Sequence, residues 1–370
     1  MSERGGKLHL LLGCTGLNWM RLALRYGRSV DRSHLDRVRR ITLATAAGTP
    51  IRLAEALRYR RQITRQALRP PVFILGHWRS GTTNMHNLLL QDPQYGYVSL
   101  LHAVAQAYFL TAGDRFRKLL AHRLPATRPM DAVPVGLDEP MSEDFAMAPI
   151  SDLTHYHGYF FPREADATFR RTVLFENVPP GVVERWGRTY VRMLKKVTLA
   201  HDGRRLVLKN PPNTGRIRQL VKLFPGAKFI HVARNPFVVY ESTLKLMDRF
   251  HTTYALQDYD RQTVEEQILQ RYRMLMERYF ADRDLIPPGN LVEVRHEDVE
   301  RDAVGVLEGI YRDLDLPGFE NARPRLERYV ASVSDYQKNV YDFSPLTVSR
   351  VRETLRFLLE RWDYDLPTGG

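Results

Sequence analysis

The sequence predicts an α/β fold in which helices flank a parallel β-sheet. Short apolar runs alternate along the chain with stretches whose apolar residues recur every three or four positions, and this alternation is typical of parallel sheets. A glycine-rich loop follows the first apolar run. Three of the four predicted strands lead into basic residues, Arg79, Lys209 and Arg234. Because parallel strands bring their carboxyl ends to one edge of a sheet, we expect these cations to lie together there.

The composition is that of an ordinary soluble globular protein apart from its charge. The chain has 370 residues, 44% of them hydrophobic and 26% charged, enough for one large domain or two smaller ones. Its net charge of +13 suits a polyanionic ligand, nucleic acid or an anionic membrane, although an arginine-favouring genome gives the same surplus. The single cysteine, Cys14, excludes an internal disulfide and predicts a reducing, cytoplasmic location.

Residues 1–65 are predicted to form an N-terminal helical extension to an α/β domain over residues 66–370. Within it, residues 8–62 favour two or three arginine-rich amphipathic helices. The first apolar stretch is short and is interrupted by Arg21 and Arg25, so it does not qualify as a membrane-spanning helix. The apolar run before Cys14 is also shorter than a lipoprotein signal requires. Two interpretations remain open: the helices cap the core, or they lie on a membrane surface.

The first strand–loop–helix unit occupies residues 72–90. Its loop fits the phosphate-binding pattern G-x-x-x-x-G-K-[ST] from Gly76 to Thr83, except that Thr82 stands in the lysine position and Arg79 supplies a cation. Free N–H groups and the positive end of the following helix dipole make this an anion site. We expect the anion to be held by Arg79, Ser80, Gly81, Thr82 and Thr83. Loss of the lysine argues against hydrolysis of ATP or GTP.

The remaining elements continue the same pattern. Strands are predicted at "RLVLKNPP", which Pro211 and Pro212 stop, at "KFIHVARNP" and at "NLVEVRHEDV". Helices are predicted over about 183–197, 214–224, 236–247, 263–281, 304–314 and 347–361. Asn235 is a suitable N-cap, with Pro236 as the first helical residue. The stretch from about 90 to 165 is of mixed character and holds an acidic cluster, "GLDEPMSEDFAMA", and an aromatic run, "THYHGYFFP".

Taken in order, these motifs resemble those of sulfotransferases. "GHWRSGTT" is similar to their 5′-phosphosulfate loop, and "FIHVARNPFVVYESTLKL" to their 3′-phosphate motif. "LVLKNPPNTGRI" resembles the strand that carries their catalytic lysine, and "LVEVRHEDVERD" a later strand end. The resemblance covers about residues 70–345 and is nearest to a bacterial-type branch, rather than to the cytosolic phenol and steroid enzymes. It implies a P-loop-like, sulfotransferase-type sheet.

The resemblance also implies a reaction. A sulfuryl group would move from 3′-phosphoadenosine-5′-phosphosulfate (PAPS) to an acceptor hydroxyl, with no metal ion. Residues 79–83 would hold the 5′-phosphosulfate, and Arg234 with Ser242 the 3′-phosphate. Lys209 would stabilise charge on the bridging oxygen as the bond to sulfur breaks. Lys338 and Asn339 would add late contacts to the 3′-phosphate.

The general base is where the sequence departs from the cytosolic enzymes. Their histidine two residues after the lysine is replaced here by Pro211, yet a base must still take the proton from the acceptor hydroxyl. Glu143 is the first choice, because other branches use a glutamate, and His86 is the second. Further candidates are Glu139, Asp144 and His102.

Two other functions compete with this interpretation. A P-loop phosphotransferase is disfavoured by Thr82, which replaces the lysine. A non-enzymatic basic protein that binds nucleic acid or membrane would explain the charge, but not three basic strand ends in order. We therefore expect no nucleic-acid partner.

The acceptor is expected to be hydrophobic, lipid- or sterol-like, and reached by reversible contact with the inner face of the membrane. The aromatic run Tyr156 to Phe161 is expected near the acceptor pocket. Apolar residues accompany the arginines of the N-terminal segment and would insert into lipid; they include Leu10, Leu11, Leu12, Trp19, Met20 and Leu24. The sequence specifies neither the acceptor nor the oligomeric state.

Overall fold

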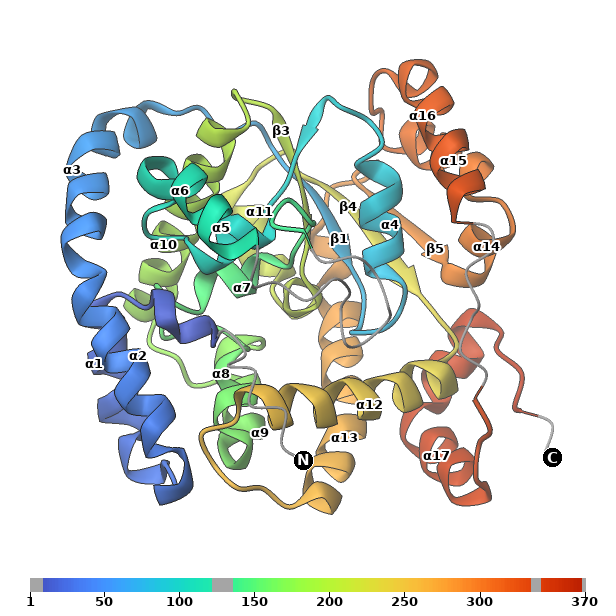
Figure 1. Cartoon of the computed structure of the whole chain (residues 1–370). Helices are drawn as coiled ribbons and strands as arrows, with labels where there is room; N and C mark the ends of the chain where they lie inside the picture. The colour runs from blue at the N-terminus through green and yellow to red at the C-terminus, as the bar shows by residue number, and fades with distance from the viewer. Residues whose placement is uncertain (1–8, 122–135, 334–340, 368–370) are drawn as a thin grey trace. The chain divides into compact units, whose positions relative to one another are not determined.

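A computed structural model describes residues 9–121, 136–333 and 341–367 (Figure 1). The chain divides into two compact units, each assembled from segments that are distant in sequence. Unit 1 comprises Met1–Ala67, Val98–Ala200 and Leu246–Arg261. Unit 2 comprises Leu68–Tyr97, His201–Lys245 and Gln262–Gly370. The sequence favoured a different division, into residues 1–65 and 66–370, and that division stays a prediction.

Unit 2 contains a five-stranded parallel sheet with the order β2-β3-β1-β4-β5. The strands are β1 (Val72–Leu75), β2 (Tyr95–Gly96), β3 (Arg205–Lys209), β4 (Lys228–Ala233) and β5 (Leu291–Arg295). The predicted α/β fold is therefore confirmed, including four predicted strands. The sequence did not indicate β2, because two residues are too few to show a strand period.

The strand register places the predicted cations beside the central strand. Ile74 of β1 pairs with Lys209 at the end of β3, and Leu75 pairs with His231 of β4. Since β1 lies between β3 and β4, the loop that leaves β1 is flanked by the ends of both neighbours. All four residues of β1 are fully buried, as expected for a central strand with both faces covered.

Helices complete unit 2 and build its core with the sheet. Apolar residues of β1, β3 and β4 pack with α4, α15 and α16 in one buried cluster. The helices are α4 (Thr82–Leu89), α11 (Ile217–Leu223), α13 (Arg261–Asp282), α14 (His296–Arg301), α15 (Ala303–Asp313), α16 (Phe319–Ser332) and α17 (Pro345–Trp362), with 3-10 turns η5 (Pro211–Gly215) and η6 (Arg283–Leu285). The helix α12 (Pro236–Tyr254) begins in unit 2 and ends in unit 1. The Asn235 side chain accepts a hydrogen bond from Phe237 N at 3.0 Å, which confirms the predicted N-cap.

The described elements of unit 1 are helices. Three of them, α1 (Gly16–Tyr26), α2 (Leu35–Ala47) and α3 (Thr49–Arg65), form the N-terminal part, as the sequence predicted. Later come α5 (Leu100–Val104), α6 (Phe109–Ala121), α7 (Glu143–Met147), α8 (His157–Phe160), α9 (Ala165–Thr172) and α10 (Pro180–Ala200). Short 3-10 turns are η1 (Leu10–Gly13), η2 (Gly27–Ser29), η3 (Arg32–His34) and η4 (Pro162–Glu164). The sequence did not resolve α5 to α9; of these, α5, α7, α8 and α9 have only four to eight residues, too few for a clear period.

The aromatic run "HYHGYFF" builds the core of unit 1. Tyr159 stacks on Phe250 with ring centroids 4.6 Å apart, and Phe161 stacks on Tyr26 at 4.3 Å. Phe160 is fully buried. Leu10 and Leu11 are buried as well, with exposed fractions of 5% and 0%. Leu10 and Leu11, which the sequence suggested for membrane contact, instead stabilise unit 1 by burial. The expected place of the aromatic run near the acceptor pocket stays a prediction.

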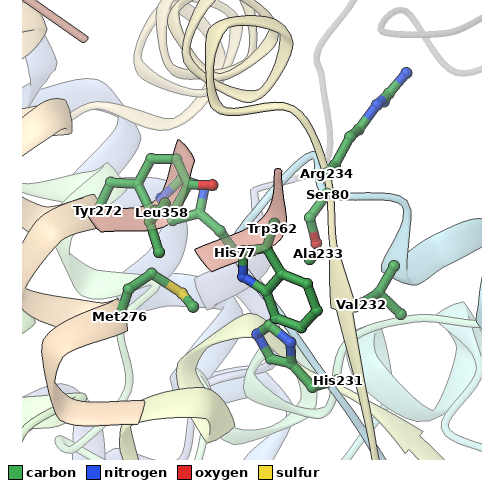
Figure 2. Close-up of a pocket in the computed structure, with 10 residues that line it drawn as sticks. All are labelled: His77, Ser80, His231, Val232, Ala233, Arg234, Tyr272, Met276, Leu358 and Trp362. Carbon is green, nitrogen blue, oxygen red and sulfur yellow. The ribbon is translucent and has the colours of Figure 1, made fainter. Parts of the chain in front are cut away.

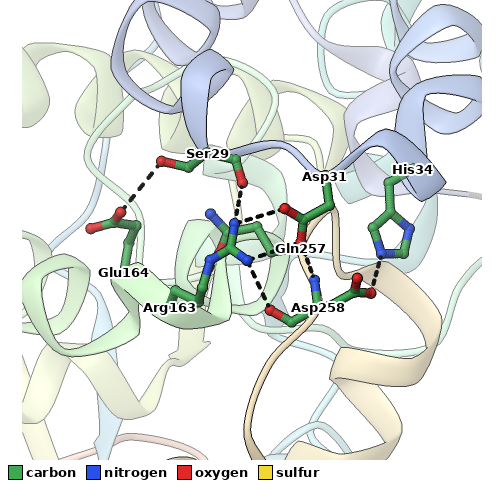
Figure 3. A network of polar contacts seen from close by, with 7 residues as sticks. All are labelled: Ser29, Asp31, His34, Arg163, Glu164, Gln257 and Asp258. Carbon is green, nitrogen blue, oxygen red and sulfur yellow. Dashed lines mark hydrogen bonds and ion pairs between the residues drawn. The ribbon is translucent and has the colours of Figure 1, made fainter.

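A polar network holds the turn between α1 and α2 in place (Figure 3). Arg163 donates to both carboxylate oxygens of Asp31 at 3.0 Å and to the Ser29 carbonyl at 2.7 Å. Asp258 N also donates to Asp31, at 2.6 Å, and His34 lies 3.4 Å from the Asp258 carboxylate. Hydrogen bonds from Arg163 hold the pKa of Asp31 below its ordinary value. The turn is therefore tied to two other segments of the unit.

Candidate active site

The loop between β1 and α4 turns tightly because of its backbone conformations. Gly76 and Gly81 have φ of 139° and 94°, a region that favours glycine, and Arg79 between them has φ of 68°. A Cβ at Gly81 would lie 2.3 Å from Nδ1 of His296, and one at Gly76 would lie 2.6 Å from the Val232 carbonyl. Both positions therefore require glycine, and Gly81 directly precedes the first turn of α4.

The structure brings together three residues that the sequence placed on phosphate groups. The Arg79 guanidinium donates to the Ser242 hydroxyl at 2.8 Å, and Arg234 donates to the Arg79 carbonyl at 3.2 Å. Arg79 belongs to the loop, Arg234 follows β4, and Ser242 lies on α12. Both arginines are half-buried. Two cations beside a helix N-terminus favour an anion at this point.

The hydroxyl groups of the loop surround the start of α4. Ser80 and Thr82 are buried and Thr83 is half-buried. The Ser80 hydroxyl has no hydrogen-bond partner among the described residues. The first N–H groups of α4 also lack partners within the helix, as at every helix start. These donors suit an anionic ligand.

Two contacts that fix the loop were not assigned from the sequence. The Thr214 hydroxyl accepts from Gly76 N at 2.8 Å and lies 3.1 Å from the Gly76 carbonyl, which ties the loop to the segment after β3. Glu297 accepts from Asn235 N at 3.0 Å and from the Tyr364 hydroxyl at 2.8 Å, and its neighbour His296 packs on Gly81. Thr214, His296 and Glu297 lie in motifs that the sequence singled out. Their position near the site could therefore be predicted, but the groups that they contact could not.

Lys209 is half-buried at the carboxyl end of β3, one strand from the loop. His86 of α4 lies nearby in the same unit and is fully buried; its Nε2 is 3.2 Å from the Val207 carbonyl. Burial, and secondarily the charge of Lys209, lowers the pKa of His86 to about 3. A base this weak accepts protons poorly near neutral pH, which weighs against a catalytic role for His86.

The other base candidates lie in unit 1. Glu143, on α7, is fully buried and accepts a hydrogen bond from the Tyr190 hydroxyl at 2.9 Å. Asp144 accepts from His155 N at 3.1 Å, so its carboxylate supports the backbone that follows. His102 forms a capping box with Ser99 at the start of α5, and Glu139 is half-buried. Lys338 and Asn339 lie outside the described residues.

A small pocket borders the loop inside unit 2 (Figure 2). Ring stacking shapes it: His77 stacks on Tyr272 with centroids 3.8 Å apart, and His231 stacks on Trp362 at 5.8 Å. Burial lowers the pKa of both histidines to about 3, so both are neutral at physiological pH. The pocket is lined by His77, Ser80, His231, Val232, Ala233, Arg234, Tyr272, Met276, Leu358 and Trp362. The Arg234 side chain points away from the two histidines (Figure 2).

Comparison with known proteins identifies the family. Residues 70–321, more than half of the chain, match the sulfotransferase family. The chain belongs to that family. The enzyme is therefore a sulfotransferase, as its motifs suggested. Over the described residues we find no cluster of three or more side chains that could hold a metal ion.

Several mycobacterial proteins are similar along nearly the whole chain. The omega-hydroxy-beta-dihydromenaquinone-9 sulfotransferase Stf3 of Mycobacterium tuberculosis, and that of Mycobacterium bovis, is 29% identical over 360 residues, which are 97% of this chain and 92% of the relative. The crystal structure of sulfotransferase STF9 from Mycobacterium avium has a TM-score of 0.73 at 18% identity and covers 97% of this chain and 98% of its own. STF1 from Mycobacterium tuberculosis gives 0.62 at 19% identity, with 90% of each chain covered. The two structures show that the fold is shared.

Proposed function

We propose that this sulfotransferase moves a sulfuryl group from PAPS to the hydroxyl of a hydrophobic, lipid-like acceptor. One observation carries the choice of PAPS as sulfuryl donor. Arg79, Arg234 and Ser242 come from separate elements but are joined by two hydrogen bonds, Arg79 to Ser242 and Arg234 to the Arg79 carbonyl. The resemblance assigns the first residue to the 5′-phosphosulfate and the other two to the 3′-phosphate. A ligand with phosphate at both positions would engage all three.

In this proposal each group has a separate task. The loop from Arg79 to Thr83 binds the 5′-phosphosulfate through side chains and the N–H groups that begin α4. Arg234 and Ser242 bind the 3′-phosphate, and Lys338 and Asn339 add to that contact. Lys209 donates to the bridging oxygen as negative charge develops there, which lowers the barrier to cleavage of the bond to sulfur.

Glu143 is proposed to take the proton from the acceptor hydroxyl. Glu143 is fully buried, so bulk water does not compete for its carboxylate. The hydrogen bond from Tyr190 would hold the carboxylate in a fixed orientation. His86 is the second choice, and its low pKa makes it a weaker one.

The nature of the acceptor is supported by similarity. The relative Stf3 is named for a hydroxylated dihydromenaquinone, and this chain covers 92% of its length. A hydrophobic alcohol of this kind resides in membrane, so we propose that the enzyme is cytoplasmic and contacts the inner face of the membrane reversibly. Nucleic acid is not part of this proposal.

Titration calorimetry with adenosine 3′,5′-bisphosphate and with ATP tests the donor. We expect the bisphosphate to bind more tightly. Arg79→Ala and Arg234→Ala should each cost about 1.5–3 kcal/mol, or roughly ten- to a hundredfold in Kd, because each removes a charge-assisted hydrogen bond. Arg325→Ala, an exposed arginine of α16, is the matched control and should leave the affinity unchanged.

Activity completes the test. Transfer of radiolabelled sulfate from PAPS to hydroxylated lipids should survive EDTA, because sulfuryl transfer needs no Mg²⁺ bridge. Equal affinity for ATP together with a strict Mg²⁺ requirement would contradict the proposal and favour a phosphotransferase.

A further inference from the structure

We propose that the outer faces of α1, α2 and α3 form a docking surface for an anionic lipid bilayer. We call this set of faces the arginine–leucine surface; its apolar members are Leu17, Met20, Leu24, Leu35, Leu43, Ile51, Leu53 and Leu57. The purpose of this surface rests on the proposed function, since an enzyme with a lipid acceptor must reach it at a membrane. The evidence for the surface itself comes from the exposed residues of the three helices.

Exposed apolar side chains are concentrated on these three helices. Twelve large hydrophobic side chains are exposed among the described residues, and the eight of the arginine–leucine surface are two thirds of them. Leu24 is 82% exposed and Leu57 is 77% exposed. A single exposed leucine needs no explanation, but such a concentration on consecutive helices indicates an interaction surface.

The first helix is apolar on two opposite faces. Asn18, Leu22 and Tyr26 recur every four residues and are buried against the rest of the unit. Leu17, Met20 and Leu24 are spaced by three and four residues and are exposed. At 100° per residue, this second set lies on the side of the helix away from the first. The inner face stabilises the fold, so the outer face is not required for it.

The first half of the third helix buries two charged residues and exposes leucines. Arg52 and Glu55 are buried, at 7% and 2% exposure, whereas Leu53 and Leu57 face outward. Both charged groups have partners within unit 1: Glu55 pairs with Lys196 and accepts from Thr111 N at 2.7 Å, and Arg52 donates to the Thr45 carbonyl. Since Leu53 and Leu57 lie on the exposed side of α3, away from Arg52 and Glu55, hydrophobic burial within unit 1 does not explain these leucines.

The charge around these leucines specifies the partner. Asp36 is the one exposed acidic residue among residues 16–65. The exposed arginines of this segment number nine: Arg25, Arg28, Arg32, Arg39, Arg40, Arg58, Arg60, Arg61 and Arg65. Apolar residues that insert beside cations are typical of helices bound to anionic lipid. A second copy of the same surface would oppose arginines to arginines, which disfavours self-association through it.

The surface is held on a fixed support. The network around Arg163 fixes the turn between α1 and α2 (Figure 3), and Trp19 of α1 donates to the Thr42 hydroxyl of α2 at 3.0 Å. Over the described residues, the helices are all too short or too polar to cross a bilayer. The geometry therefore points to a protein that lies on the bilayer and inserts leucines shallowly, rather than one that crosses it.

Sedimentation of the full chain with lipid vesicles tests the surface. We expect binding to vesicles of phosphatidylcholine mixed with phosphatidylglycerol, and weaker binding to phosphatidylcholine alone or at high salt. The variant Leu24→Gln/Leu53→Gln/Leu57→Gln should lower the partition coefficient by about tenfold or more, because it removes inserted apolar area. The variant Leu285→Gln/Val333→Gln/Leu346→Gln changes three exposed apolar residues elsewhere and is the matched control.

The outcomes separate this inference from the proposed function. Nucleotide affinity and sulfation of a detergent-dispersed alcohol are measured on the same proteins, and both should be unchanged in the leucine variant. Intact nucleotide binding without vesicle binding would overturn the docking surface and leave the function standing. Vesicle binding without nucleotide binding would overturn the proposed function and leave the docking surface standing. An equal loss in the control variant, or a wild-type oligomer that the leucine variant dissociates, would also overturn the docking surface.

Discussion

Lys209 and Glu143 show how single residues are set up for different tasks. Lys209 lies half-buried at a strand end beside the loop, where a charge can meet a ligand. Glu143 is buried with a tyrosine hydroxyl as its donor. The proposed roles differ in when they act, since a group that stabilises a transition state affects kcat more than ground-state binding.

For Lys209 we predict a loss of rate rather than of affinity. Lys209→Ala should lower kcat by roughly 10²–10³, because a preorganised donor to the leaving oxygen is lost, and should change the Kd for adenosine 3′,5′-bisphosphate little. Lys228→Ala, at the start of β4 and so at the opposite edge of the sheet, is the control. Equal effects on kcat and Kd would show that Lys209 binds the ground state instead.

For Glu143 the conservative variant separates proton transfer from structure. Glu143→Gln keeps the shape of the side chain but removes its basicity, so kcat should fall by roughly 10²–10⁴ with nucleotide affinity retained. Tyr190→Phe removes the hydrogen bond to Glu143 and keeps the carboxylate. If both variants lose the same modest amount of activity, Glu143 has a structural role and a different base must be sought.

At the scale of elements, the loop and α4 depend on one glycine. Gly81→Ala places a methyl group 2.3 Å from the His296 ring in a left-handed conformation, which costs about 1–2 kcal/mol before the clash is counted. We predict a lower unfolding midpoint in urea and weaker nucleotide binding. Gly181→Ala, in helix α10 with nothing within 4 Å of the new Cβ, should be neutral or stabilising. Similar midpoints for the two variants would contradict this account of the loop.

Elements with a clear local sequence pattern could be predicted. The strands β1, β3, β4 and β5 appear as apolar runs, and Asn235–Pro236 marks the start of α12. The burial of Glu55 on α3 could not be predicted, because this carboxylate pairs inside the unit with Lys196, a residue of α10 far along the chain. A local pattern assigns charged residues to solvent unless their partners are known.

Some residues of the candidate site could likewise be predicted from local patterns, and others could not. The loop spacing and strand ends indicated Arg79, Lys209 and Arg234, because those positions follow local patterns, whereas Ser242 was implied by the resemblance to sulfotransferases. Thr214 and His296 fix the loop through contacts between distant segments, and nothing in their local sequence shows which groups they meet. The base has no local pattern at all, so Glu143 stays a prediction.

At the scale of the whole molecule, buried neutral histidines make stability depend on pH. Burial lowers the pKa of His77, His86 and His231 to about 3, and that of His9 and His157 to about 4. In the unfolded chain these groups titrate near 6.5. The unfolded state therefore binds more protons as the pH falls below 6.5, so the free energy of unfolding decreases from about pH 6.5 toward pH 4.

His231 provides the test of this linkage. Neither of its ring nitrogens has a hydrogen-bond partner among the described residues, and Tyr279 stacks on it at 4.1 Å. His231→Phe keeps an aromatic ring there but removes the proton site. We predict a shallower loss of stability between pH 6.5 and 4 than in the wild type, measured as urea midpoints. A parallel pH profile would show that His231 does not contribute.

The interleaved composition of the two units has a consequence for synthesis on the ribosome. Unit 1 needs residues up to Arg261, and unit 2 needs α17, near the end of the chain. Neither unit can close while its last segment is still being translated, although α1 and α3 have already emerged with residues such as Leu22 and Ile63, which the finished unit buries, still uncovered. The nascent chain therefore exposes apolar surface through most of its elongation, and we expect chaperones that bind nascent polypeptides to raise its yield.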